Sequence, residues 1–127
     1  MSENNNEIEK SFLNKRVLLV EDNEINAEVV TSMLEVKNIA VEVVYDGEEA
    51  VDKFETSAPG YYNAILMDIE MPVMNGVEAS KVIRNLHKQD AMTIPIISVT
   101  ANPIFENIFF SRKYGMDDCL LYTSDAA

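Results

Sequence analysis

The sequence predicts an α/β domain, a doubly wound parallel β-sheet with helices on both faces. Short apolar runs rich in Val and Ile alternate along the chain with longer segments of helical spacing. Such alternation implies parallel strands joined by right-handed helical crossovers. Most of the runs are continuously apolar, as strands buried on both faces require. The chain has 127 residues, which is enough for one domain with its own core.

The predicted strands fall on four apolar runs, at residues 17–20, 41–44, 64–67 and 94–99. In the second run the charged Glu42 interrupts the apolar pattern, so we expect this strand at an edge of the sheet. The first and third strands are then central neighbours. The topological switch point falls between them, and doubly wound sheets bind ligands at the carboxyl ends of the strands at such a point.

Amphipathic helices are expected between these strands. The first is expected to bury one face, made of Ile25, Val29, Val30, Met33 and Leu34. The second follows a cap at Asp46 and Gly47 and turns inward Ala50, Val51 and Phe54. The third is expected from residue 75 or 76 to residue 88. A further helix over residues 104–114 carries more apolar surface than one stripe, which indicates packing within the domain or contact with a partner or second copy.

The composition excludes several classes of function. With 22 acidic against 10 basic side chains, the formal charge is -12, so direct binding to nucleic acid or to an anionic membrane is not expected. The start of the chain lacks the apolar stretch of a secretion signal, and no run approaches about 18 apolar residues, so no membrane span is expected. Cys119 is the single cysteine, which favours a reduced, cytoplasmic compartment.

Acidic and hydroxyl side chains follow three of the predicted strands. The first strand leads into Glu21 and Asp22, the third into Asp68 and the fourth into Thr100. Because the carboxyl ends of parallel strands meet at one edge of the sheet, we expect these four side chains to converge. Three carboxylates in one cleft cannot all stay ionised without a large cost. A hard divalent cation, Mg²⁺ or Mn²⁺, would relieve the repulsion, since the donors are oxygens and include no His or Cys.

A magnesium site of this kind predicts phosphoryl chemistry, because Mg²⁺ in proteins is commonly bound by one or two carboxylates together with phosphate oxygens. The chain has no GxxxxGK[ST] phosphate loop, so a bound nucleoside triphosphate is not the expected donor. A carboxylate can itself attack phosphorus and form an aspartyl phosphate. We therefore predict Asp68 as the nucleophile and Thr100 as the hydroxyl that binds the transferred group.

Four motifs carry a resemblance to a known family. VLLVEDNEIN, ILMDIEMPVMNG, IPIISVTAN and GMDD, in this order and at these spacings, resemble the receiver domain of bacterial two-component response regulators. The segments EDNEIN and MPVMNG are most similar to receivers attached to hybrid sensor kinases. The resemblance implies a five-stranded parallel sheet in the order 2-1-3-4-5. It also implies a signalling module that promotes only its own phosphorylation and dephosphorylation, and is otherwise not an enzyme.

The same resemblance implies roles for individual residues. Asp68 would accept a phosphoryl group from the phosphohistidine of a sensor histidine kinase or of a histidine phosphotransfer domain. Asp22, Asp68 and the main-chain carbonyl of Glu70 would bind Mg²⁺, while Glu21 would act largely through bound water. Thr100 would turn inward on phosphorylation and shift the segment that follows it.

The end of the chain departs from the family pattern. Tyr122 and Thr123 stand where the family has a Lys, usually followed by Pro, and Cys119 stands at the family's aromatic switch position. No residues remain for a fifth helix. Residues 119–127 are similar to the translated end of a sequencing-library adapter. We therefore expect a flexible tail at residues 1–14, the receiver domain at 15–118 and a non-native tail at 119–127.

Two other functions stay open. A degenerate receiver would bind partners without being phosphorylated, in keeping with the missing Lys. A phosphatase with an aspartyl intermediate would need a second Asp two positions after Asp68, where Glu70 stands, and a cap domain that the chain does not accommodate. The phosphoacceptor module is the leading prediction.

Overall fold

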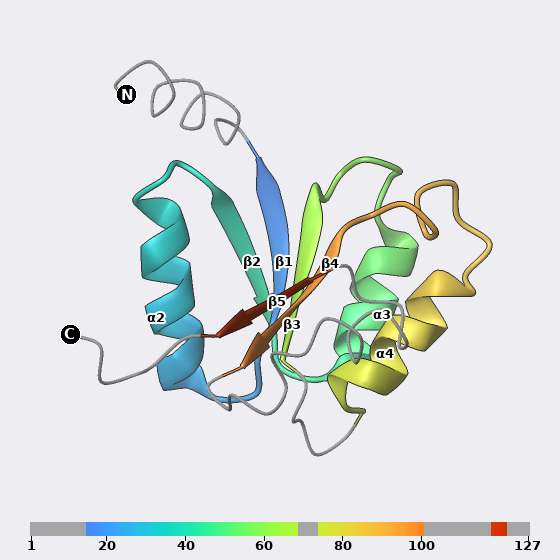
Figure 1. The fold of residues 1–127 in the computed structure, drawn as a ribbon. Coiled ribbons are helices and arrows are strands. Elements are labelled where there is room, and N and C mark those ends of the chain that lie inside the picture. Colours follow the sequence, from blue (N-terminus) through green and yellow to red (C-terminus); the bar gives the residue numbers. More distant parts are fainter. Residues whose placement is uncertain (1–14, 69–73, 101–117, 122–127) are drawn as a thin grey trace.

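Five parallel strands form the sheet of the computed structural model, which describes residues 15–68, 74–100 and 118–121 (Figure 1). The strands are β1 (Arg16–Val20), β2 (Ala40–Val44), β3 (Ala64–Asp68), β4 (Ile96–Thr100) and β5 (Asp118–Leu121). Their spatial order is β2-β1-β3-β4-β5. The predicted fold class is confirmed, with β2 at one edge and with β1 and β3 as central neighbours.

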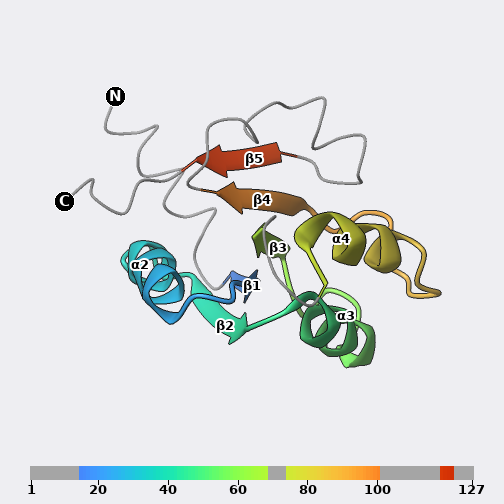
Figure 2. The same cartoon turned by 90° about the horizontal axis from the view of Figure 1, so that it is seen from below.

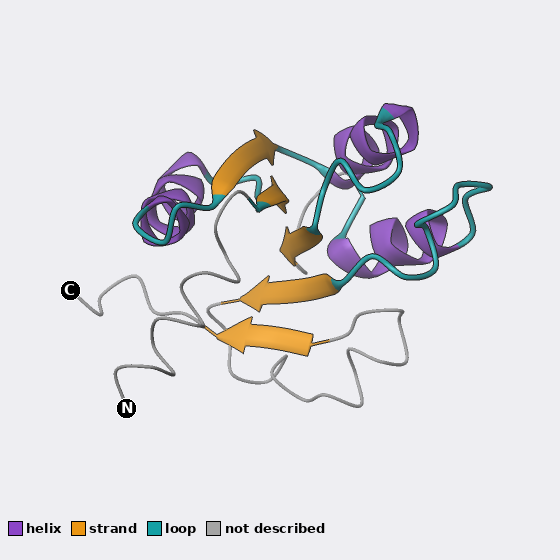
Figure 3. Cartoon of the chain, turned by 90° about the horizontal axis from the view of Figure 1, so that it is seen from above, coloured by secondary structure: helices purple, strands orange, loops and turns teal. Residues whose placement is uncertain are grey.

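Helices cover both faces of this sheet. They are α2 (Glu24–Glu35), α3 (Gly47–Thr56) and α4 (Gly76–Arg84). Figures 2 and 3 show α2 on one face and α3 and α4 together on the other. Because successive side chains of a strand point to opposite faces, Leu18 and Val20 of β1 belong to the core under α3 and α4, whereas Val17 and Leu19 belong to the core under α2. The central strands are therefore buried on both faces, as their continuous apolar runs predict.

The register of the central strands decides which residues meet at their carboxyl ends. Val20 of β1 is paired with Met67 of β3, and Asp68 of β3 is paired with Val99 of β4. Glu21 follows Val20, and Asp68 follows Met67. Two acidic residues therefore leave neighbouring strands side by side.

Each described helix begins with an Asx cap. The side chains of Asn23, Asp46 and Asn75 accept hydrogen bonds from backbone N–H groups three residues on, at 3.0, 2.8 and 2.9 Å. An oxygen at this position satisfies one of the N–H groups that the first turn of a helix leaves without a partner. The predicted cap at Asp46 and the predicted start of the third helix are confirmed. All three helices start at the edge of the sheet where the strands end.

The predicted inward face of the first helix is wrong in part. Ile25 and Met33 are 70% and 59% exposed, whereas Ala27 and Val30 are buried. Leu34 packs against the same core from its border. The helix packs on the sheet through the stripe that contains Ala27 and Val30. The apolar surface of α2 is therefore wider than the strip that the sheet covers.

The other two helices follow their predictions more closely. In α3 the inward residues Ala50 and Phe54 are buried, as predicted. The helix α4 ends at Arg84 and not at residue 88. The side-chain amide of Asn85 donates a hydrogen bond of 2.8 Å to the carbonyl of Lys81, the acceptor that a continuing helix would give to the backbone of residue 85. The chain turns there and begins a long connection to β4.

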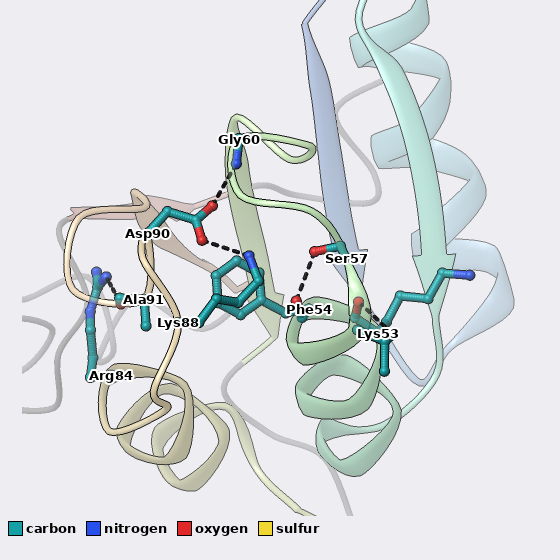
Figure 4. Close-up of polar contacts among 9 residues, drawn as sticks. Lys53, Phe54, Ser57, Gly60, Arg84, Lys88, Asp90 and Ala91 are labelled. Carbon is teal, nitrogen blue, oxygen red and sulfur yellow. Dashed lines mark hydrogen bonds and ion pairs between the residues drawn. The ribbon is translucent and has the colours of Figure 1, made fainter.

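This connection carries a charged pair that is largely withdrawn from water (Figure 4). Lys88 Nζ forms an ion pair with Asp90 and lies 4.0 Å from the centroid of the Phe54 ring. Asp90 also accepts a hydrogen bond of 2.9 Å from the N–H of Gly60. We call Phe54, Gly60, Lys88 and Asp90 the Lys88 cluster. It joins α3 to the connections that precede β3 and β4, at the amino ends of the strands.

Several predictions fall outside the described residues. They concern the tail at residues 1–14, the segment 69–73, the helix expected at 104–114 and the end of the chain after residue 121. The strand β5 takes in the first three residues of segment 119–127, while the domain boundaries and the non-native origin of that segment stay predictions. Of the helices that the structure describes, none has the length and apolar character needed to cross a membrane.

Candidate functional site

Three carboxylates converge at the carboxyl ends of β1 and β3. Glu21 and Asp22 directly follow β1, and Asp68 is the last residue of β3. One oxygen from each side chain lies within 4.8 Å of the other two. The predicted convergence of these acids is confirmed, and its cause is the register that pairs Val20 with Met67. We call Glu21, Asp22 and Asp68 the acidic cluster.

The members of the acidic cluster differ in their contact with water. Glu21 is 2% exposed, Asp68 is half-buried and Asp22 is exposed. The N–H of Glu21 donates a hydrogen bond of 3.0 Å to the carbonyl of Val44, and its carboxylate accepts one of 3.2 Å from the N–H of Asn23. The end of β2 and the turn into α2 therefore set the position of the most buried acid.

Burial first, and charge repulsion second, disfavour the ionised form of Glu21. Burial raises the pKa of Glu21 above its ordinary value, while hydrogen bonds with the N–H of Asn23 and with Asp68 act in the opposite direction. The interaction with Asp22 adds to the increase in the pKa of Glu21. A proton on Glu21 thus relieves part of the repulsion. A bound cation would relieve it too and would compete with that proton.

The donor set of the acidic cluster fits a hard divalent cation. All three donors are carboxylate oxygens that can face a common point, and neither His nor Cys is among them. Magnesium prefers such oxygens and usually keeps several of its waters, which an exposed Asp22 and a half-buried Asp68 permit. The arrangement can therefore concentrate positive charge next to a carboxylate that is accessible from solution.

The two remaining predicted site residues are described less fully. Thr100 is the last residue of β4 and lies one position beyond Val99, the strand partner of Asp68. Its backbone therefore ends at the same edge of the sheet as the acidic cluster. Glu70 lies between β3 and α4, outside the described residues. The roles of Thr100 and of the Glu70 carbonyl stay predictions.

Sequence reasoning missed the contribution of Asn23. Its side chain caps α2, and its backbone N–H donates to the carboxylate of Glu21. An Asn immediately before an amphipathic segment is a recognisable cap signal. The second contact depends on how the turn from β1 folds back on itself, which residue types alone do not show.

A doubly wound parallel sheet with acidic residues at its switch point defines a class of α/β domains that bind their ligands at this edge. The profile of the response regulator receiver domain matches residues 17–126 of the chain. The chain therefore belongs to the family of response regulator receiver domains, which are signalling modules of two-component phosphorelays.

Two curated relatives are kinases of fungi. The chain is 35% identical over 105 residues to the peroxide stress-activated histidine kinase mak1 of Schizosaccharomyces pombe, a match that covers 82% of this chain and 6% of the relative. It is 36% identical over 115 residues to the osmosensing histidine protein kinase SLN1 of Saccharomyces cerevisiae, covering 88% of this chain and 9% of the relative. The chain thus spans only a small part of the length of these relatives.

Solved structures show the same fold. The receiver domain of the sensor histidine kinase PA1611 from Pseudomonas aeruginosa, which has a magnesium ion coordinated in its active site cleft, is 36% identical with a TM-score of 0.71, and 84% of each chain is covered. The receiver domain of the histidine kinase CKI1 from Arabidopsis thaliana, complexed with Mg²⁺ and BeF₃⁻, is 30% identical with a TM-score of 0.73. That match covers 89% of this chain and 84% of the other.

Proposed function

We propose that the chain is a phosphoacceptor receiver in which Asp68 accepts a phosphoryl group in a reaction that depends on Mg²⁺. The observation that carries this proposal is the acidic cluster, whose three carboxylate oxygens lie within 4.8 Å of one another beside the central strands. Asp68 is half-buried and so remains accessible to a donor, whereas Glu21 is 2% exposed. Accessibility therefore favours Asp68 over Glu21 as the nucleophile.

The metal would be bound by Asp22, Asp68 and the main-chain carbonyl of Glu70, with Glu21 acting through bound water. When bound, Mg²⁺ supplies positive charge that neutralises both the cluster and the oxygens of the transferred group. Mn²⁺ would accept the same oxygen donors. The magnesium ion coordinated in the active site cleft of the PA1611 receiver domain supports this choice of cofactor.

The donor would be a phosphohistidine of a sensor histidine kinase or of a histidine phosphotransfer domain. A carboxylate oxygen of Asp68 would form a bond to phosphorus as the phosphorus–nitrogen bond breaks and the imidazole leaves. The hydroxyl of Thr100 would bind the transferred group and bias the domain between two conformations. The chain would thus promote only its own phosphorylation and dephosphorylation. The histidine kinases among its relatives support this class of partner.

Acetyl phosphate tests the proposal, because it donates a phosphoryl group without a protein partner. With Mg²⁺ present, intact-protein mass spectrometry should show the gain of one phosphoryl group, and EDTA should prevent it. Asp68→Asn should abolish the gain. Asp90→Asn is the matched control and should label normally. It changes an acid that is also half-buried but lies at the amino ends of the strands, away from the acidic cluster. Labelling that persists in Asp68→Asn would exclude Asp68 as the acceptor.

A degenerate receiver is the second candidate, and one feature of the sequence favours it. Tyr122 and Thr123 follow β5, where the family has its Lys. A degenerate receiver would show no labelling by acetyl phosphate or by a phosphohistidine donor, and its binding to a partner would be unchanged by Asp68→Asn. The complete acidic cluster supports the phosphoacceptor function instead.

A further inference from the structure

Two helices on the same face of the sheet begin with a buried glycine. Gly47 is the first residue of α3, and Gly76 is the first residue of α4. Neither has the positive φ that favours glycine, which among the described glycines occurs only at Gly60. The absence of a side chain at these two positions must therefore be explained by their neighbours and not by backbone conformation.

The neighbour of Gly76 is the backbone of the proposed phosphoacceptor. A Cβ atom on Gly76 would overlap the carbonyl oxygen of Asp68 and would lie 2.8 Å from Cγ of Met67. The first turn of α4 is therefore packed directly on the end of β3. The cap of Asn75, which accepts a hydrogen bond of 2.9 Å from the N–H of Glu78, holds the same turn in place.

The neighbour of Gly47 is Met74, which lies two residues before the start of α4 at Gly76. A Cβ atom on Gly47 would overlap the carbonyl oxygen of Met74 and would lie 2.8 Å from both Cβ and Cγ of Met74. Because the nearest atom belongs to the main chain, a change of rotamer at Met74 cannot relieve the overlap. The turn between β2 and α3 therefore limits where the backbone of Met74 can lie.

We propose that Gly47 is a positioning residue for the acidic cluster, acting through its contact with Met74 and through the contact of Gly76 with the carbonyl of Asp68. The inference rests on the proposed function, because it concerns Mg²⁺ binding and phosphorylation at Asp68. A methyl group on Gly47 would displace Met74 and the adjoining start of α4, which packs on Asp68. Small displacements of a reacting group are costly, since about 1 Å can reduce a rate about 10²-fold.

The test compares wild type with Gly47→Ala in two measurements. Isothermal titration calorimetry gives the affinity for Mg²⁺ in the absence of any phosphoryl donor, and mass spectrometry gives the rate of labelling by acetyl phosphate. We expect both to fall by about fivefold or more in Gly47→Ala. Gly76→Ala, whose methyl group meets Asp68 directly, should show the larger loss. Urea-induced unfolding reports the folded fraction, so that only folded protein is compared.

Gly60→Ala is the matched control. Gly60 has a φ of 79°, and an added Cβ would have nothing within 4 Å, so alanine strains the backbone there without new contacts. This variant should lose stability while binding Mg²⁺ and labelling like wild type. Adding Met74→Ala to Gly47→Ala should not restore Mg²⁺ affinity, because the closest overlap is with a main-chain oxygen.

The outcomes separate the inference from the function on which it rests. A folded Gly47→Ala protein that binds Mg²⁺ and labels like wild type overturns the inference alone, and so does an equal loss in Gly60→Ala. Wild-type protein that neither binds Mg²⁺ nor labels overturns the proposed function. If Gly47→Ala is unfolded, the titration is repeated in trimethylamine N-oxide, which favours the compact state. If Gly47→Ala stays unfolded in trimethylamine N-oxide, the role of Gly47 is purely structural, which also overturns the inference.

Discussion

The two ends of the sheet differ in how their charged side chains are arranged: like charges meet at one end, and opposite charges pair at the other. At the carboxyl ends of the strands, the acidic cluster brings three carboxylates within 4.8 Å of one another. At the amino ends, the Lys88 cluster places an ammonium group beside a carboxylate and over an aromatic ring (Figure 4). Like charges held together oppose folding, whereas a paired and packed charge is tolerated in a partly buried place. The comparison supports the proposal that the acidic cluster binds a cation, and we expect the Lys88 cluster to contribute to stability.

Paired charges also occur along the edge strand. The carboxylate of Glu42 accepts hydrogen bonds from the hydroxyl groups of Tyr61 and Tyr62, at 2.9 and 2.7 Å. The guanidinium of Arg16 lies 4.0 Å from the centroid of the Tyr61 ring. We call Arg16, Glu42, Tyr61 and Tyr62 the Glu42 cluster. Glu42, which interrupts an apolar run in the sequence, thus has two hydrogen-bond donors for its carboxylate in the structure.

The largest expected effect is the loss of the aromatic ring from the Lys88 cluster. Phe54 is fully buried, so Phe54→Ala leaves a cavity and removes the ring beneath Lys88. We expect the free energy of unfolding to fall by about 3–5 kcal/mol, measured by urea unfolding. Val82→Ala, at a position of α4 that is 38% exposed, is the control and should change it by less than about 0.5 kcal/mol. A comparable loss in both variants would contradict the central role of Phe54.

A smaller loss is expected when the charged pair is broken. Asp90→Asn leaves the ammonium group of Lys88, whose side chain is 7% exposed, without its carboxylate. We expect a loss of about 1–3 kcal/mol in urea unfolding. Glu55→Gln, on the exposed surface of α3, should have little effect. If folded Asp90→Asn protein failed to label with acetyl phosphate, the assignment of stability and binding to opposite ends of the sheet would be wrong.

Removing a charge from the acidic cluster should instead increase the free energy of unfolding. Glu21→Gln removes one of three like charges and keeps an acceptor for the N–H of Asn23, so without Mg²⁺ we expect a gain of about 1 kcal/mol. Mg²⁺ at about 100 times its dissociation constant should stabilise wild type by about 2.7 kcal/mol, and at the same concentration should stabilise the variant less. Thermal unfolding with Mg²⁺ and with EDTA measures both. A destabilised variant in EDTA would contradict the repulsion argument.

The smallest expected effect is a change in the pH dependence of stability when the Glu42 cluster loses its carboxylate. Burial acts to raise the pKa of Glu42, but hydrogen bonds from Tyr62 and Tyr61, with Lys53 and Arg16 nearby, outweigh it and lower the pKa below its ordinary value of 4.5. A lowered pKa contributes stability above the unfolded value that is lost as the pH falls through the folded value. Glu42→Gln should therefore reduce the loss of stability below about pH 4.5, by about 0.5 kcal/mol because the site is accessible to solvent.

The raised pKa of Glu21 gives the contrasting pH dependence. A raised pKa contributes stability that is complete below the ordinary value of 4.5 and is lost as the pH rises through the folded value. Unfolding of the metal-free protein against pH should therefore show a loss above pH 4.5 that Glu21→Gln removes. A loss of equal size in both proteins would assign it to other groups.

Most of the fold could be predicted from short-range patterns. The apolar runs marked four of the five strands, β1 to β4, because a strand buried on both faces must be apolar throughout, and the interruption at Glu42 marked the edge. The fifth strand was expected only from the family resemblance. The acidic cluster could be predicted for a related reason. Parallel strands end at the same edge, so residues that follow them meet even when, as with Asp22 and Asp68, they are far apart in the chain.

Features that depend on packing could not be predicted in this way. The inward face of α2 was predicted from its larger apolar side chains, but the helix lies on Ala27, and Ile25 is 70% exposed. The end of α4 at Arg84 depends on the side chain of Asn85, and the burial of Lys88 depends on a ring supplied by α3. For each of these features the residue types permit several different contacts, and only the packed structure shows which contact forms.

The sequence by itself determined four strands of the sheet, the edge position of β2 and the meeting of three acids, because the alternation of strands and helices leaves few arrangements of the chain. The tertiary structure decided which acid is buried, which charges are paired and which glycine packs against the backbone of Asp68. These properties arise from distances between atoms of different elements, and such distances exist only once the helices are packed on the sheet.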